Sequence, residues 1–341
     1  MSTTESNPVR TTDSDICVAQ GELTLPDALP LHFGGVLPAA KIAWRLEGAA
    51  HRPVVLVLGG ISAGRYVVAT TDPLATPGWW KSVMGPELAL DTYRYQVLGM
   101  DFIGGSGSST GPTRGQTDFP SISAFDQVHA IAQLLQHLNI KQLHAVIGAS
   151  YGAMVALALG QASPELAQRL IAVSGAHRTH PMATAWRSVQ RAMVRYATAH
   201  NEGPEGLRLA RALAMATYRS PDEFAQRFSD PPQRTANGFV FPVEQYLFSR
   251  GDAYAASYIP ESFVCLSESI DLHQVDPEKI EVPTTLVAVQ EDQLVPFSDM
   301  QDLHENLGGP AKLIALSSLY GHDAFLKETD AMHDIFVQAL R

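Results

Sequence analysis

The chain has 341 residues, 45% of them hydrophobic, so it can bury a core large enough for one sizeable α/β domain with an insertion. Its formal charge of −11 disfavours a general affinity for nucleic acid or for anionic membranes, because both bind to a positive face. Only Cys17 and Cys265 are present, which argues against a disulfide scaffold. No stretch has the apolar core of a signal peptide or the length of a membrane span, and we expect a soluble, cytoplasmic protein.

The order of predicted elements indicates the fold class. Residues 1–20 are polar and without pattern, which predicts a disordered N-terminal segment. Helical periodicity at residues 122–138 and 151–162 falls between short apolar runs of the kind that form buried parallel strands. These runs lie at residues 54–60, 95–102, 143–150, 169–176, 284–292 and 311–318. The alternation predicts an α/β fold with a doubly wound, mostly parallel sheet.

The alternation of strands and helices stops in the second half of the chain. Three helical patterns, at residues 185–199, 205–219 and 242–259, follow one another without a strand between them. We therefore expect a helical cap, or lid, at residues 181–276, inserted into a core formed by residues 21–180 and 277–341. A final helix is expected to begin near Asp330.

A nucleophile motif follows the third apolar run. The sequence Gly148-Ala149-Ser150-Tyr151-Gly152 stands between a predicted strand and an apolar helix, which is the context that the G-x-S-x-G elbow of the α/β-hydrolase fold requires. Small residues are needed two positions before and after the serine, because the turn is tight and its backbone strained. This predicts Ser150 as the nucleophile and the Tyr151 backbone N–H as one oxyanion donor.

The partners of such a serine come later in the chain, an acid after a late strand and a histidine after the last strand. His322 follows the last predicted strand and is the expected general base, because imidazole titrates near neutral pH. Asp292 is the expected orienting acid, with Glu291 the weaker candidate.

A second oxyanion donor is expected from the loop after the first of these strands, at the Ile61 N–H. The glycines before it are also compatible with a simple turn. The sequence carries no metal-binding motif, and a serine triad needs neither a metal nor a cofactor, so we expect none.

Beyond the elbow, the sequence resembles the MetX-type homoserine O-acyltransferases of the α/β-hydrolase superfamily, from about residue 31 to the C-terminus. The matching segments are residues 77–80 (PGWW), 85–86 (GP), 90–92 (LDT), 104–112 (GGSGSSTGP), 217–220 (TYRS), 243–247 (VEQYL) and 321–326 (GHDAFL).

The resemblance implies an acyltransferase of methionine biosynthesis that moves an acyl group from coenzyme A to Ser150, and then to the hydroxyl of L-homoserine. Acyl-CoA is thus a co-substrate. The resemblance also implies that Arg219 binds the acceptor carboxylate and that Asp323 binds its ammonium group. The relatives commonly form homodimers, and we expect a homodimer for this chain.

Departures from the family pattern bear on the acyl donor. Residues 59–65 read GGISAGR, and this short version resembles the succinyl-using branch, so succinyl-CoA is slightly preferred over acetyl-CoA. Arg65 is a candidate for binding a succinyl carboxylate, with a solvated surface arginine as the alternative.

Three other functions stay open at this point. L-serine is a close alternative acceptor, because one methylene changes binding by only about 10- to 200-fold. An esterase or thioesterase would use the same triad with water. A binding protein of the same fold would require a broken triad, and this one is complete in sequence.

Overall fold

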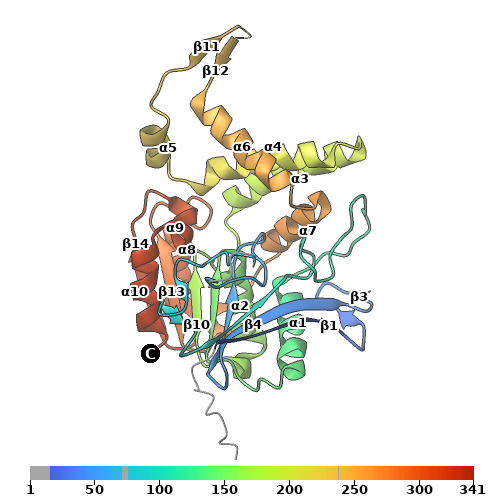
Figure 1. Ribbon diagram of the computed structural model, residues 1–341, viewed down its shortest axis with the longest axis vertical. Helices are drawn as coiled ribbons and strands as arrows, with labels where there is room; N and C mark the ends of the chain where they lie inside the picture. The colour runs from blue at the N-terminus through green and yellow to red at the C-terminus, as the bar shows by residue number, and fades with distance from the viewer. Residues whose placement is uncertain (1–15, 71–75, 237) are drawn as a thin grey trace, which may run out of the picture.

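An eight-stranded sheet forms the centre of the computed structural model, which describes residues 16–70, 76–236 and 238–341 (Figure 1). The first two neighbouring pairs are antiparallel and the remaining pairs are parallel. In spatial order the strands are β1 (Ile16–Thr24), β4 (Lys41–Ala49), β8 (Gln96–Met100), β5 (Val54–Leu58), β9 (Ala145–Ala149), β10 (Leu170–Val173), β13 (Thr284–Val289) and β14 (Ala311–Leu316). The predicted α/β-hydrolase fold class is confirmed.

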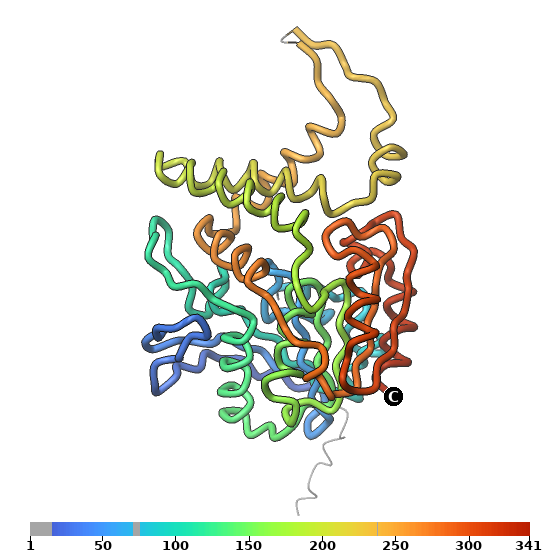
Figure 2. The backbone as a smooth tube through the Cα atoms, turned by 180° about the vertical axis from the view of Figure 1, so that it is seen from behind, coloured from blue at the N-terminus to red at the C-terminus, as the bar shows by residue number. Residues whose placement is uncertain are grey.

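Helices cover both faces of the sheet, because the inner strands are apolar on both sides. In β5, Leu56 and Leu58 pack into one hydrophobic cluster with helices α1 (Ala124–His137), α2 (Tyr151–Ala162) and α8 (Phe297–Asn306). The alternate residues Val55 and Val57 pack into a second cluster, with Trp80 and helix α10 (Thr329–Ala339). Figure 2 shows the N-terminal strands and the C-terminal helix at opposite ends of the sheet.

Short elements complete the core. They are β2 (Leu29–Pro30), β3 (Val36–Leu37), β6 (Met84–Gly85), β7 (Leu90–Asp91) and α9 (Ala324–Lys327), with 3-10 turns at Pro164–Leu166, Pro277–Lys279 and Gly321–Asp323.

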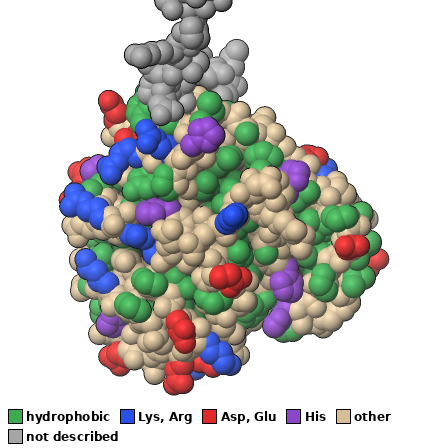
Figure 3. Space-filling model, turned by 90° about the horizontal axis from the view of Figure 1, so that it is seen from below, with side chains coloured by type: hydrophobic (Ala, Val, Ile, Leu, Met, Phe, Trp, Pro, Cys, Tyr) green, Lys and Arg blue, Asp and Glu red, His purple; other side chains and the backbone are tan. Residues whose placement is uncertain are grey.

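On the face opposite the cap, basic, acidic and apolar side chains lie next to one another (Figure 3). None of the helices in the described ranges is long and apolar enough to cross a membrane.

The N-terminal prediction was wrong in part. Residues 1–15 lie outside the described residues, but residues 16–20 are not disordered, since they begin strand β1. Every residue of β1 pairs with a residue of β4. Most of its side chains are exposed at the sheet edge, so the backbone ladder holds the strand. Its apolar residues run together at 16–19 without the alternation that marks a half-buried strand.

The insertion after β10 is largely helical and lies above the sheet (Figure 1). Helix α3 packs along α4 and against α7, and α4 packs along α6. A bridge between Arg178 and Gln274 joins the two chain segments that connect the cap to the core. The cap elements are α3 (Pro181–Ala199), α4 (Gly203–Tyr218), α5 (Pro221–Arg227), β11 (Gln233–Thr235), β12 (Gly238–Val240), α6 (Pro242–Ala255) and α7 (Pro260–Asp271).

Candidate active site

Ser150 occupies a strained turn between β9 and α2. Its φ of 55° and ψ of −118° are rare for a residue with a side chain. The glycines around it permit this turn. A Cβ at Gly148 would lie 2.1 Å from the Gly152 carbonyl oxygen, and a Cβ at Gly152 would lie 2.3 Å from the Leu58 oxygen. The glycines therefore let the strand and the helix approach closely enough to present the serine hydroxyl above the sheet edge.

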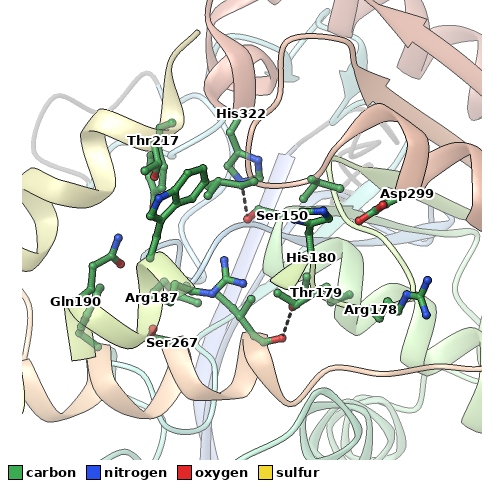
Figure 4. A pocket seen from close by; sticks show the side chains of 18 residues that line it. Ser150, Arg178, Thr179, His180, Arg187, Gln190, Thr217, Ser267, Asp299 and His322 are labelled. Carbon is green, nitrogen blue, oxygen red and sulfur yellow. Dashed lines mark hydrogen bonds between the residues drawn. The ribbon is translucent and has the colours of Figure 1, made fainter. Parts of the chain in front are cut away.

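Ser150, His322 and Asp292 form one chain of hydrogen bonds. His322 Nε2 lies 2.9 Å from Ser150 Oγ, an interaction visible in Figure 4, and Nδ1 lies 2.7 Å from Asp292 Oδ2. The other Asp292 oxygen accepts hydrogen bonds from the backbone N–H groups of Leu294 and Val295, at 2.8 and 3.0 Å. The carboxylate is thus fixed by backbone, and it fixes the imidazole in turn.

The surroundings of His322 decide its protonation. Burial lowers the pKa of this imidazole, but the charge of Asp292 and the hydrogen bond to it raise the pKa, and the net pKa lies above its ordinary value. Arg187 acts weakly in the opposite direction. An imidazole with a raised pKa, bonded to a serine hydroxyl, is suited to accept that hydroxyl's proton.

The loop that carries Ile61 lies next to the elbow that carries Ser150 and Tyr151. The Gly152 N–H donates to the Gly59 oxygen at 2.9 Å, which ties the elbow to the loop after β5. Neither the Ile61 N–H nor the Tyr151 N–H donates to another group among the described residues. The Tyr151 ring points into the core, where its hydroxyl lies 2.6 Å from Ser269 Oγ, and burial raises the pKa of this phenol.

Two cavities meet at Ser150, and both are lined by Ile61, Tyr218, Ile270 and His322. The first, called the Arg187 cavity, has a volume of about 40 Å³ and runs beneath the cap. Its other polar lining residues include Arg178, Thr179, His180, Arg187, Gln190, Thr217, Ser267 and Asp299 (Figure 4). The second, the Arg211 cavity, has a volume of about 230 Å³, and its other lining residues include Gly60, Ser62, Trp79, Arg211, Asp323 and Phe325.

Comparison with known proteins identifies the family. Residues 53–329 match the family model described as alpha/beta hydrolase fold. The chain is 41% identical to a homoserine O-succinyltransferase of Xanthomonas campestris pv. campestris, over 96% of this chain and 86% of that protein. This chain belongs to the homoserine O-acyltransferase family. It is also 33% identical to a serine O-succinyltransferase of Xylella fastidiosa, over 89% of this chain and 92% of the relative. The crystal structure of esterase E22 shares the fold, with a TM-score of 0.85 at 22% identity, covering 95% of this chain and all of that one.

In this member of the homoserine O-acyltransferase family, Arg219 is paired with other residues of the chain. Arg219 ends helix α4 in an extended conformation and lines neither cavity. Its Nε lies 3.1 Å from Asp323, its Nη1 3.9 Å from Glu223, and its guanidinium stacks on the Tyr320 ring. Arg219 therefore forms an ion pair with Asp323, although its Nε has no aligned hydrogen bond to the described residues. Its direct binding of the substrate stays a prediction.

Arg211, which sequence reasoning missed, is the arginine that lines the Arg211 cavity. It lies two helical turns before Tyr218 on α4, and its guanidinium packs over the rings of Tyr218 and Tyr254, at 5.1 and 4.7 Å. Burial lowers the pKa of Arg211, but Tyr218, Tyr254 and Asp323 raise it to a net value above the ordinary one. Arg211 is thus a permanent cation on the same wall as Asp323. The spacing of seven between Arg211 and Tyr218 was the available signal, because it puts both residues on one helix face.

Arg65 is also not where a succinyl group would meet it. Its guanidinium pairs with Asp101 and stacks on Tyr66, its backbone N–H donates to the same carboxylate at 2.8 Å, and it lines neither cavity. Asp101 also accepts a hydrogen bond from the Ser108 N–H. Arg65 and Asp101 therefore join two loops to each other, and the position of Arg65 lends no support to its predicted role in acyl recognition.

Among the residues that the structure describes, no three or more His, Cys, Asp or Glu side chains are grouped so that they could hold a metal ion.

A second residue that sequence reasoning missed is Arg187 of α3, on the wall of the Arg187 cavity. Neither Arg187 nor Arg211 belongs to a sequence motif. The packing of the cap helices, which the local sequence does not show, brings both side chains to the cavities at Ser150.

Proposed function

We propose that this protein is an acyl-CoA:L-homoserine O-acyltransferase that prefers succinyl-CoA and works through an acyl-Ser150 intermediate. One observation carries the proposal: the bonded Ser150, His322 and Asp292 open onto a cavity whose wall holds a cation, Arg211, and an anion, Asp323. An esterase for simple esters has no need of this pair of charges.

The first half-reaction loads the serine. Ser150 Oγ attacks the thioester carbonyl carbon while its proton moves to His322 Nε2. The Tyr151 and Ile61 N–H groups stabilise the oxyanion that forms. The carbon–sulfur bond then breaks, and the departing thiolate takes the proton from His322, which leaves coenzyme A free and an ester on Ser150.

The second half-reaction uses the same groups in reverse. The hydroxyl of homoserine gives its proton to His322 Nε2 and attacks the ester carbonyl, and the carbon–oxygen bond to Ser150 breaks as Oγ takes that proton back. Asp292 stabilises the imidazolium in both halves, consistent with its 2.7 Å contact and its fixed position. The product is an O-acyl homoserine.

The acceptor is a zwitterion, which needs one charge of each sign on the protein. Arg211 offers a planar donor fork to the carboxylate, and Asp323 accepts from the ammonium group. The rings of Tyr218 and Tyr254 hold the guanidinium in place, and Arg219 holds Asp323. Both charged groups are therefore oriented before the substrate arrives.

A four-way assay tests the proposal. Purified protein is supplied with succinyl-CoA or acetyl-CoA and with L-homoserine or L-serine, and both the free thiol and the acylated amino acid are measured. We expect succinyl-CoA with homoserine to give the highest kcat/KM. Release of thiol at a rate indifferent to either amino acid would contradict the transferase and leave a thioesterase.

We also propose that two chains associate through the cap. Helix α3 exposes Met182, Val189 and Tyr196, which are seven residues apart and so lie on one helix face. Tyr196 is 71% exposed. Sedimentation should show a dimer that Tyr196→Glu weakens, and a monomeric wild-type protein would contradict this association.

A further inference from the structure

A buried cluster of charges lies in the cap beside Ser150. It consists of Arg187 and Arg191 on α3 and Asp271 at the end of α7, whose side chains are 12%, 10% and 9% exposed. Arg187 Nε donates to Asp271 Oδ1 at 2.8 Å, and Arg191 Nη1 pairs with Oδ2. Thr184 also donates to Oδ1. Two guanidinium groups thus share one carboxylate, and the cluster has an excess of one positive charge.

The two arginines differ in how fully they are bonded. Arg191 also donates to the Ser267 backbone oxygen and hydroxyl, and to Ser188. Arg187 makes one aligned hydrogen bond to the described residues, from Nε. Its Nη2 lies 2.7 Å from the same Asp271 oxygen, but the N–H does not point at it, and this buried atom has no hydrogen-bond partner in the described part of the chain. Of the two guanidinium groups, Arg187 is therefore the one with N–H groups that lack an acceptor.

Arg187 faces the Arg187 cavity, whereas Arg191 does not line it. In Figure 4 the Arg187 guanidinium points to the middle of the cavity, on the cap side of Ser150 and His322. The cavity is narrow, about 40 Å³, so an acyl chain that extends into it from Ser150 lies against the side chains of its wall. An acyl chain that ends in a carboxylate would bring an acceptor to the Arg187 N–H groups that the shared Asp271 carboxylate leaves without one.

We propose that Arg187 binds the distal carboxylate of a dicarboxylic acyl group carried on Ser150, and so selects succinyl over uncharged acyl donors. The inference rests on the proposed acyl transfer and adds the residue that recognises the acyl group. The bound carboxylate balances the cluster, since two guanidinium groups then face two carboxylates, and it supplies the acceptor that the Arg187 N–H groups lack.

The other charged groups that line the Arg187 cavity also favour a position of the acyl carboxylate beside Arg187. Asp299 and Arg178 lie on the opposite side of Ser150 from Gln190 and Ser267 in Figure 4. Arg178 is 64% exposed in its side chain and lies 3.8 Å from Asp302, so solvent weakens its pull on an anion. Asp299 repels an acyl carboxylate from that side. His180 uses its ring to cap α3. The cap side, with Arg187, is the favourable one.

The arrangement separates the two substrates by charge. The acyl carboxylate lies in the Arg187 cavity, while the acceptor uses Arg211 and Asp323 in the Arg211 cavity. Both cavities open onto Ser150, so the acyl group can stay in place while coenzyme A leaves and the amino acid enters.

The test compares donors of equal length with and without the carboxylate. Wild-type protein is assayed with succinyl-CoA, butyryl-CoA and acetyl-CoA, with homoserine as acceptor. We expect succinyl-CoA to exceed butyryl-CoA in kcat/KM by about 10-fold or more. In Arg187→Gln the value for succinyl-CoA should fall by about 10- to 100-fold, while acetyl-CoA changes by less than about 3-fold. Arg187→Lys keeps the charge and should retain part of the preference.

Arg191→Gln is the matched control, because it removes the other guanidinium from Asp271 without altering the cavity wall. It should leave the ratio of succinyl-CoA to acetyl-CoA close to that of the wild type. Equal loss for both donors in Arg187→Gln would overturn the inference and assign Arg187 a structural role. If that variant does not fold, wild-type kcat/KM values that are equal for succinyl-CoA and butyryl-CoA would overturn it as well.

Failure of the proposed function gives a different pattern. Wild-type protein that moves no acyl group to homoserine or serine, but hydrolyses acyl-CoA, would defeat the transferase. The Arg187 inference would still be decided by hydrolysis, since succinyl-CoA should be cleaved faster than butyryl-CoA and lose that advantage in Arg187→Gln. Transfer from every donor without a carboxylate preference would defeat the inference alone.

Discussion

The core and the cap hold their functional side chains in different ways. In the core, backbone geometry does the positioning: the strained turn holds Ser150, and two N–H groups hold Asp292. In the cap, other side chains do it, since aromatic rings hold Arg211 and a shared carboxylate holds Arg187. Backbone positions tolerate little change, whereas side-chain supports can be exchanged one at a time. In the proposed function the core therefore carries the reaction, and the cap supplies the two arginines that help to select the substrates.

The largest effect should come from removing the nucleophile. Ser150→Ala should lower acyl transfer by about 10⁴-fold or more, because no other group can carry the acyl chain. Mass spectrometry after mixing with succinyl-CoA alone should find the acyl group on wild-type protein and none on the variant. Turnover unchanged in Ser150→Ala would break the assignment of the reaction to the core.

The next effect should come from the acid of the triad. Asp292→Asn should lower kcat by about 10³- to 10⁴-fold, since an amide neither orients the needed tautomer nor stabilises the imidazolium. In the wild type, activity requires neutral His322, so kcat/KM should rise with pH through a pKa above the ordinary value. The variant loses the charge that raises this pKa, and its acid limb should move to lower pH. An acid limb that stays in place would mean that the charge of Asp292 does not raise the pKa of His322.

Removal of a cap residue should change KM for the acceptor, whereas removal of the triad acid changes kcat. Arg211→Gln should raise KM for homoserine by about 100-fold, because it removes a charge-assisted pair from the acceptor site. The burst of coenzyme A released before homoserine is added should stay near the wild-type rate. If the acylation burst fell as steeply as transfer, Arg211 would act in the acylation of Ser150 and not only in acceptor binding. The proposed difference between core and cap would then not hold.

Arg219→Gln is the companion to this experiment, since Arg211 lies on α4, Arg219 is the C-cap residue of the same helix, and both carry a positive charge near Asp323. Arg219 lines neither cavity, so its loss should raise KM less than the loss of Arg211. A larger effect at Arg219 would restore the expectation drawn from the sequence.

Sequence reasoning brought the right residues together where position follows from local order along the chain. Ser150, Asp292 and His322 stand at the ends of apolar strands, and parallel strands bring those ends to one edge. It failed where position depends on packing between helices. Nothing near Arg187 in sequence indicates that α3 turns it toward Ser150, and nothing near Arg219 indicates that its guanidinium pairs with Asp323. Strand β1 was missed because an edge strand needs little apolar surface.

The smallest effect concerns the junction of the two regions. His273 is buried where the chain returns from the cap, next to the bridge of Arg178 with Gln274. Burial lowers its pKa to about 3, so the folded state holds it neutral. The unfolded chain binds the proton at higher pH, and stability is therefore full above about pH 6.5 and declines as the pH falls toward 3. We expect His273 alone to contribute a loss of about 2 kcal/mol of unfolding free energy between about pH 7.5 and pH 5.

Urea denaturation of wild type and His273→Leu at both pH values measures this loss. The variant should be less stable at the higher pH, since leucine does not match the shape of imidazole, but its stability should change less with pH. It should keep part of the slope, because burial also lowers the pKa of His177 on the neighbouring segment. If His273→Leu and the wild type lose stability equally on acidification, the acid sensitivity does not lie at the junction, and core and cap are joined by contacts that do not titrate.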